Sequence, residues 1–326
     1  MATLKDVAAK AGVTVTTVSR MLNNRGYISQ QTREKVLAAM KELDYHPNEL
    51  ARSLTKRHTN IIGIIVPSVA HPFFSQAVNE LEMAASASGY KTLLCNSFHQ
   101  AYKEMEYLDM LRAHKVAGVV LCSRTQDIGG HLESGLPIVT FERSDAGNVS
   151  SVSCDNFQGG VLATEHLIAR GCRCLLHFSG SHGVQMPADQ RCAAFQDTCR
   201  RYHLEGRVFE TEEAQFQTMD YGDYIRQVLE RNPDADGIFA SSDVIAAQVL
   251  QACAALGRRV PEDVQVIGFD DVPLARLTTP QLTTIRQPIR QMSVYAINAI
   301  QRQADHEGAP SRTVFPVTLE CRASTR

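Results

Sequence analysis

Residues 4–24 most constrain what this chain can fold into, because they read as two short helices joined by a tight turn. Apolar residues recur at helical spacing over the first helix, at Leu4, Val7, Ala8 and Ala11. Gly12 stands where a helix needs a left-handed terminating residue. Thr14 follows as an N-cap whose hydroxyl can accept from the free N–H groups of the next turn.

The second helix has two unlike sides. Val18 and Leu22, four residues apart, give it a buried side. The opposite side carries hydrogen-bonding groups and one long cation: Thr16, Thr17, Ser19, Arg20 and Asn23. This pattern is typical of a recognition helix in a DNA major groove. The alternative is a small helical hairpin inside an ordinary core.

A third amphipathic helix is predicted over 31–43, with Val36, Met40 and Leu43 on one side. A three-helix headpiece of this size is only marginally stable alone. Pro47 ends this helix, because the residue before proline is pushed out of the helical region, and it can start a new short helix over 48–54.

These segments together resemble the DNA-binding headpiece and hinge of the lactose-repressor (LacI/GalR) family. The resemblance rests on Leu4-Lys5-Asp6-Val7-Ala8, Ala11-Gly12-Val13-Thr14, Thr17-Val18-Ser19-Arg20, Thr32-Arg33, Tyr45, Pro47-Asn48 and Ala51-Arg52-Ser53-Leu54, and it continues through the chain. It implies that Val15, Thr16 and Arg20 read bases. It also implies that Leu54, with Ala51 beside it, wedges into a minor-groove step and kinks the duplex.

The expected DNA-binding residues are Thr14, Val15, Thr16, Thr17, Arg20, Asn23, Ala51 and Leu54. Some relatives carry a polar residue where this chain has Val15, which can only contact a thymine methyl or exclude a base. The alternative role for Leu54 is packing on the rest of the protein.

Charge is unevenly distributed along the chain. Residues 1–60 hold ten lysines and arginines against five acids, a net +5, whereas the whole chain carries −2, so the remainder carries −7. A basic head on an acidic body steers the head to phosphates. Binding to DNA should therefore weaken steeply with salt.

The nine cysteines are odd in number and form no CxxC pair, so we expect free buried thiols in a reducing cytoplasm. Cys172 and Cys174 as metal ligands or redox partners is the alternative. No secretory leader and no apolar run of 18 or more residues is present, which predicts a cytoplasmic protein without a membrane span.

From residue 61 onward, apolar strand-like runs alternate with helical stretches, beginning with the nearly all-apolar run 61–66. This alternation predicts an α/β fold of doubly wound parallel sheets. The rhythm restarts after Asp155, and the family resemblance implies two lobes like those of periplasmic binding proteins. The expected division is a headpiece over 1–47, a hinge helix and linker over 48–60, and a sugar-binding regulatory and dimerisation domain over 61–326. Lobe one takes about 61–157 and 288–326, with 314–320 as a late strand there, and lobe two takes about 158–287.

Ligands of open α/β sheets bind beyond the carboxyl ends of the strands, where this chain places carboxylates, amides, an arginine and aromatic rings. Such groups suit a sugar, whose hydroxyls take bidentate hydrogen bonds and whose C–H face packs on a ring. By position, the resemblance places effector contacts at Phe73, Phe74, Gln158, Arg191, Ser242 and Asp270. Asp155, Asp243 and Asp271 are expected to cap the segments that follow them.

No motif indicates catalysis: Gly180-Ser181-His182-Gly183 is not a nucleophile elbow, and no phosphate-binding glycine loop or HExxH occurs. We therefore expect no enzyme, no cofactor and no metal. The resemblance implies a homodimeric repressor of a carbohydrate operon, whose receptor region resembles sucrose and other sugar regulators. It binds double-stranded operator DNA and is released by a small sugar inducer. A cytoplasmic sugar sensor, a corepressor-dependent regulator and an activator are the alternatives.

Overall fold

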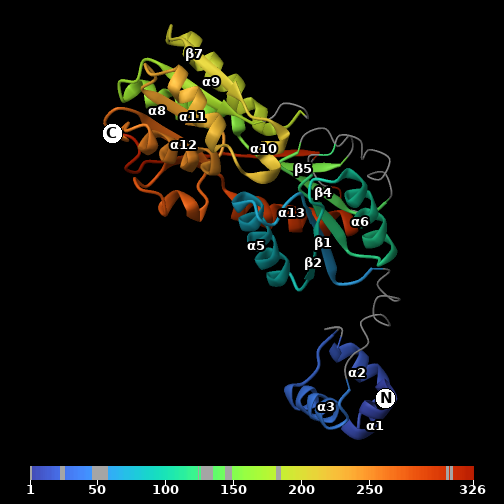
Figure 1. Cartoon of the computed structure of the whole chain (residues 1–326). Helices are drawn as coiled ribbons and strands as arrows, with labels where there is room; N and C mark the ends of the chain where they lie inside the picture. Colours follow the sequence, from blue (N-terminus) through green and yellow to red (C-terminus); the bar gives the residue numbers. More distant parts are fainter. Residues whose placement is uncertain are drawn as a thin grey trace. The chain divides into compact units, whose positions relative to one another are not determined.

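The computed structural model describes residues 2–22, 26–45, 58–123, 125, 135–143, 149–180, 185–305, 308 and 311–326. The chain divides into two compact units, Met1–Thr59 and Asn60–Arg326 (Figure 1). The predicted hinge lies outside the described residues up to position 57. Among the described residues, no helix is long and apolar enough to cross a membrane.

The first unit contains α1 (Leu4–Ala11), α2 (Val15–Leu22) and α3 (Gln30–Glu42). Gly12 ends α1 at φ +66°, and the hydroxyl of Thr14 accepts from the backbone N–H of Thr17 at 3.1 Å. Both turn predictions are confirmed. The small core centres on one valine from each helix, Val7, Val18 and Val36, all fully buried. Met21 is also buried, whereas Leu22 is only partly so.

The second unit holds two six-stranded sheets. The first has the order β11-β5-β4-β3-β1-β2, with bounds β1 Ile61–Val66, β2 Lys91–Asn96, β3 Gly118–Leu121, β4 Ile138–Phe141, β5 Ser150–Cys154 and β11 Arg312–Phe315. The second has the order β12-β10-β9-β8-β6-β7, with bounds β6 Leu175–Ser179, β7 Gly206–Glu210, β8 Gly237–Ala240, β9 Gln265–Asp270, β10 Thr283–Arg286 and β12 Thr318–Glu320. Every pairing is parallel except β10 with β12.

Helices cover both sheets, as parallel sheets require. The first sheet carries α5 (Pro72–Ala87), α6 (Ala101–Ala113) and α13 (Ile289–Ala304). The second carries α8 (Asn156–Ala169), α9 (Gln190–Arg201), α11 (Gly222–Arg231) and α12 (Asp243–Ala255), with the short α10 (Glu213–Thr218) and the 3-10 turns Pro187–Asp189 and Pro273–Arg276. The expected doubly wound α/β fold in two lobes is thus confirmed.

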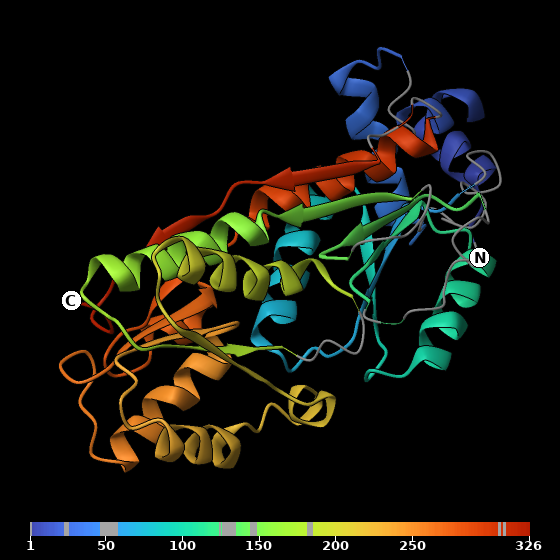
Figure 2. The same ribbon diagram turned by 90° about the horizontal axis from the view of Figure 1, so that it is seen from above.

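The chain passes between the sheets three times: from β5 to α8, from β10 to α13, and from β11 to β12. Figure 2 shows the last of these, drawn in red, running beside β5 and α8.

The sequence interpretation placed a single strand over 314–320 in lobe one. The structure instead divides this stretch between the sheets, because Pro316 has no N–H to donate and interrupts the ladder.

Candidate functional sites

The second helix of the small unit presents the side predicted to read DNA. Thr14, Thr16 and Arg20 are exposed, Val15 is 39% exposed, and Thr17 is partly buried while its hydroxyl bonds that of Thr14 at 2.9 Å. The remaining expected DNA-binding residues, Asn23, Ala51 and Leu54, lie outside the described residues. The polar, cationic face of α2 is therefore exposed, and only the opposite side of this helix packs into the core.

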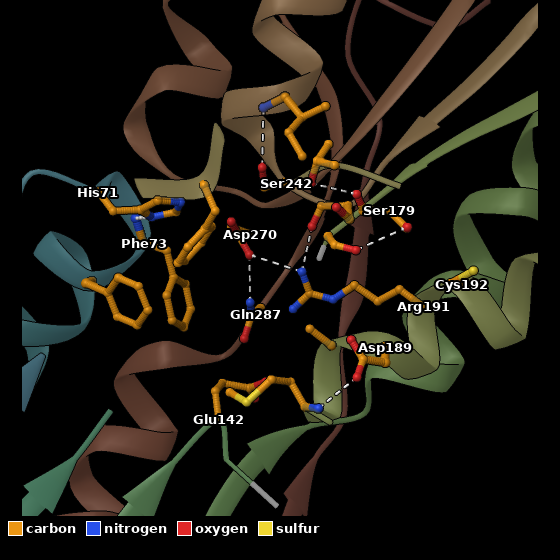
Figure 3. Close-up of a pocket in the computed structure, with 18 of the residues that line it drawn as sticks. His71, Phe73, Glu142, Ser179, Asp189, Arg191, Cys192, Ser242, Asp270 and Gln287 are labelled. Carbon is orange, nitrogen blue, oxygen red and sulfur yellow. Dashed lines mark hydrogen bonds and ion pairs between the residues drawn. The ribbon is translucent and has the colours of Figure 1, made fainter. Parts of the chain in front are cut away.

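The second unit contains a cavity between its lobes. Its empty volume is about 920 Å³, a figure that includes the solvent at its open entrance. Figure 3 shows Glu142 at one side, His71 and Phe73 at another, and Arg191 reaching in opposite them. Strand ends from both sheets supply the lining, as expected for an open α/β fold.

Aromatic rings form one wall. Phe73 and Phe74 lie in the first turn of α5 and meet edge to face at 5.2 Å between centroids. His71 caps that helix by accepting from the backbone N–H of Phe73 at 3.3 Å. From the other lobe, the Phe216 ring of α10 lies 5.5 Å from that of His71. Such a wall suits the C–H face of a small ligand.

Arg191 is the central cation of the cavity and is only 6% exposed. Its guanidinium stacks on Phe269, 3.5 Å from the ring centroid. Its Nε donates to Asn156 Oδ1 at 2.7 Å, and Nη1 donates to the Ser241 carbonyl at 2.6 Å. These contacts hold the planar fork in one orientation, ready for bidentate hydrogen bonding.

Asp270 faces this arginine from the end of β9, with Oδ1 3.8 Å from Arg191 Nη1. The same oxygen accepts from Gln287 Nε2 at 2.7 Å (Figure 3). Burial raises the pKa of Asp270 to about 7, although Arg191 and Gln287 act in the opposite direction. The carboxyl group therefore changes charge near neutral pH.

Glu142 follows β4 in the first sheet and is also buried. Its carboxylate accepts from the backbone N–H of Cys154 at 2.5 Å and from Asn156 Nδ2 at 3.0 Å. Burial raises the pKa of Glu142, against the attraction of Arg191. Glu142 and Asp270 have positive φ angles of 51° and 116°, a backbone strain typical of functional sites.

Ser242 lines the cavity and also caps α12, accepting from the backbone N–H of Ile245 at 3.3 Å.

The expectation that Asp243 caps this helix is wrong. Asp243 is fully buried and accepts from the backbone N–H of Val272 at 2.9 Å, tying α12 to the chain after β9. Asp271 likewise pairs with Arg286 at 2.6 Å instead of capping. Asp155 does cap α8, as predicted.

Five of the six predicted effector residues line the cavity: Phe73, Phe74, Arg191, Ser242 and Asp270. Gln158 does not; it is exposed on α8. Sequence reasoning missed Glu142, Asp189 and Gln287, which also line the cavity. Glu142 directly follows a predicted strand, so the strand-end rule could have found it, whereas β10, which precedes Gln287, was not predicted.

The cavity thus offers two buried carboxyl groups, one oriented guanidinium and an aromatic wall. Hydroxyl groups can donate to the carboxylates and accept from the arginine, so the arrangement suits a polyhydroxylated ligand. Among the described residues, no cluster of histidine, cysteine or acidic side chains could hold a metal ion. All nine cysteines are free thiols, and eight of them are buried or partly buried.

Comparisons with known proteins extend these observations. Residues 3–48 match the family described as bacterial regulatory proteins, lacI family, and residues 164–325 match a periplasmic binding protein-like domain. The chain is 37% identical to the ribose operon repressor of Halalkalibacterium halodurans, over all of this chain and 98% of that one. It is 35% identical to the sucrose operon repressor of Streptococcus mutans, over 98% of both chains.

Solved structures agree with this. The Lac repressor dimer bound to operator and the anti-inducer ONPF matches with a TM-score of 0.85 at 26% identity, over 99% of both chains. A periplasmic binding protein/LacI transcriptional regulator from Alkaliphilus metalliredigens, complexed with D-xylulofuranose, matches with a TM-score of 0.73 at 31% identity, over 82% of this chain and 100% of that one.

Proposed function

Because the chain belongs to the LacI family of bacterial transcriptional regulators, we propose that it represses a sugar-utilisation operon and leaves its operator when a small sugar fills the interlobe cavity. The family comprises regulatory proteins, not enzymes, and the similar relatives are named as operon repressors. The observation that carries the proposal is the buried Arg191, stacked on Phe269 and facing Asp270. An uncharged ligand rich in hydroxyls can satisfy this arginine and this carboxylate together.

D-Ribose and sucrose are the first sugars to test, because the relatives at 35–37% identity are named for these operons. Isothermal titration calorimetry of the purified protein with each sugar gives affinity and stoichiometry directly. Saturation at one sugar per chain supports the proposal. A protein that binds neither these nor other common mono- and disaccharides contradicts it.

DNA recognition is assigned to the exposed face of α2, with Arg20, Thr16 and Val15 at the base-reading positions. We propose a homodimer, which sets two such helices one helical turn apart on a near-palindromic operator in the cytoplasm. The solved Lac repressor relative is a dimer on operator. Because the first 60 residues carry a net +5, operator affinity should fall steeply with salt.

The sugar can act on DNA binding only through unequal affinities for two arrangements of the lobes. Cavity residues lie on both lobes. Gln287 lines the cavity next to one interlobe connection, and the cavity residue Arg191 bonds Asn156, which follows another. A ligand that draws these groups together therefore biases the lobe arrangement. We assign the sugar the role of inducer, so its binding favours the arrangement with low operator affinity.

A further inference from the structure

Asn156 bridges the two lobes of the second unit by hydrogen bonds. It is the first residue of α8, directly after the first interlobe connection, and it is only 1% exposed. It does not line the cavity, yet its amide joins a cavity residue of each lobe. The amide oxygen accepts from Arg191 of the second lobe, and the amide nitrogen donates to Glu142 of the first.

These partners define the orientation of the amide. Arg191 Nε can only donate, so it requires the oxygen of Asn156 on its side, at 2.7 Å. The acceptors on the other side are Glu142 Oε2 at 3.0 Å and the Cys154 carbonyl at 3.2 Å, and both require the nitrogen. Every polar atom of the side chain is thus committed, and a neutral amide is the group that satisfies an arginine and a carboxylate at once.

The contacts continue beyond this residue. From Glu142 they run through Asn156 to Arg191, then across 3.8 Å to Asp270, which accepts from Gln287 at the second interlobe connection. One series of polar contacts therefore joins two of the three connections between the lobes and passes along the cavity. Asn156 is the member that lies behind the cavity wall.

We propose that Asn156 is the positioning residue of the sugar site, whose neutral amide holds Arg191 and Glu142 in binding geometry and links sugar occupancy to the interlobe connection. This inference rests on the proposed function. It adds a residue that touches no ligand but on which sugar affinity depends, through the polarity of its hydrogen bonds to Arg191 and Glu142 and not through its bulk.

The decisive variant is Asn156→Asp, which keeps the size and the acceptor for Arg191 but replaces the donor with an oxygen. At pH 8 two carboxylates then meet at about 3 Å, which displaces Glu142; at pH 5.5 one of them takes up a proton, and the donor returns. The charged groups bonded to Asn156 are Glu142 and Arg191, Asp270 lies beyond them at 3.8 Å from Arg191, and the Cys154 thiol lies beside Glu142. We expect affinity at least about tenfold below wild type at pH 8 and within about threefold of it at pH 5.5, each compared at the same pH.

Asn232 supplies a matched control. It is buried, its Oδ1 accepts from Arg207 at 2.8 Å, and its Nδ2 donates to the Val228 carbonyl at 2.7 Å, but it does not line the cavity. Asn232→Asp should bind sugar like wild type at both pH values. Equal loss in both variants would mean that any buried asparagine tolerates the change poorly, and the proposal would be overturned.

A second measurement needs no sugar. The melting temperature of Asn156→Asp should fall, relative to wild type, between pH 5.5 and pH 8. Adding Glu142→Gln reverses the hydrogen bond, since the new amide donates to the new carboxylate, and should remove this pH-dependent loss. Failure of the reversed pair to fold, or a pH-dependent loss that persists in it, contradicts the proposal.

Sugar binding by the wild type tests the proposed function, and the behaviour of Asn156→Asp tests the role of Asn156. A wild-type protein that binds no sugar refutes the proposed function, and the melting series then still decides the structural role of Asn156. A wild-type protein that binds sugar, with Asn156→Asp equal to it at both pH values or equally weak at both, overturns the inference alone. The titrations use whichever of D-ribose or sucrose the wild type binds.

Discussion

Arg191 Nη1 and Asp270 Oδ1 lie 3.8 Å apart across the cavity, close enough to attract but too far apart for a hydrogen bond. A sugar hydroxyl can accept from the guanidinium and donate to the carboxylate at once. The separation therefore leaves room for one hydroxyl group to bridge the two side chains.

Arg191→Lys should weaken the sugar response and leave operator binding intact. Arg191→Lys keeps the positive charge but loses the planar fork that reaches Asn156, the Ser241 carbonyl and the ring of Phe269. We expect sugar affinity to fall by a factor of about ten or more, equivalent to about 1.4 kcal/mol. Calorimetry measures this loss, and a variant that binds and responds to sugar as wild type does would place the effector elsewhere.

Asp270 should make stability depend on pH. Its pKa is about 7 in the folded protein and about 3.9 in the unfolded chain, so only the folded state holds this proton between those values. The stabilisation is complete below about pH 4 and is lost as pH rises through about 7. Wild type in the absence of sugar should therefore unfold more easily at pH 8 than at pH 6.

Asp270→Asn should reduce that dependence, although Glu142, whose pKa burial also raises, still contributes to it. The variant should also raise the unfolding free energy at pH 8 by about 2 kcal/mol, because a buried charge is replaced by a neutral amide. The same variant should lose sugar affinity, since a carboxylate acceptor is gone. Urea unfolding at both pH values checks this. A less stable variant at pH 8 would show that the Asp270 carboxylate is well compensated in the folded protein.

The packing of α8 on α9 should be sensitive at Gly160. A Cβ there would lie 2.7 Å from the Arg191 carbonyl and from the Ala194 Cβ. Gly160→Ala therefore pushes away the helix that carries Arg191, and we expect a loss of about 1–3 kcal/mol in stability together with weaker sugar binding. Gly222→Ala, whose Cβ meets nothing closer than 3.9 Å, is the control and should match wild type in thermal melts and titrations.

Arg20 should determine base preference. Arg20→Ala is expected to relax discrimination at one operator position by about 1–3 kcal/mol. Lys10 provides the control. It lies on α1 and forms an ion pair with Glu42 of α3 at 2.7 Å, and Lys10→Ala should leave base preference unchanged. Competition binding against an operator library measures both, and a uniform loss on all sequences would make Arg20 a phosphate contact.

The sequence predicted the fold well because its signals are local. Alternating apolar runs and helical stretches identified nearly every element, and strand ends pointed to Asp270 and Ser242. The family resemblance correctly predicted that Arg191 lines the cavity, but it also predicted Gln158 there. Gln158 is exposed on α8, two residues beyond the buried Asn156. Which of two neighbouring amides faces inward depends on helix phase, and that phase follows from packing against residues far away in the chain.

The residues missed by sequence reasoning share one property: their roles arise from long-range contacts. Glu142 matters because Asn156 and Cys154 meet it, and Gln287 because it reaches Asp270. Gln287 follows β10, a short strand that begins soon after Pro280 and gave no clear strand pattern. The division of the C-terminal stretch at Pro316 also became visible only when both sheets were in view.

The most direct test of the central claim is operator binding measured by fluorescence anisotropy, with and without the sugar that the protein binds, using an operator selected from genomic fragments. The account predicts tight binding to that operator in the absence of sugar and a clear loss of affinity when the sugar is added, and it predicts that Arg191→Lys needs at least about ten times more sugar for the same release. Operator affinity that stays the same at saturating sugar, or release from Arg191→Lys at the same sugar concentration as from wild type, would contradict it.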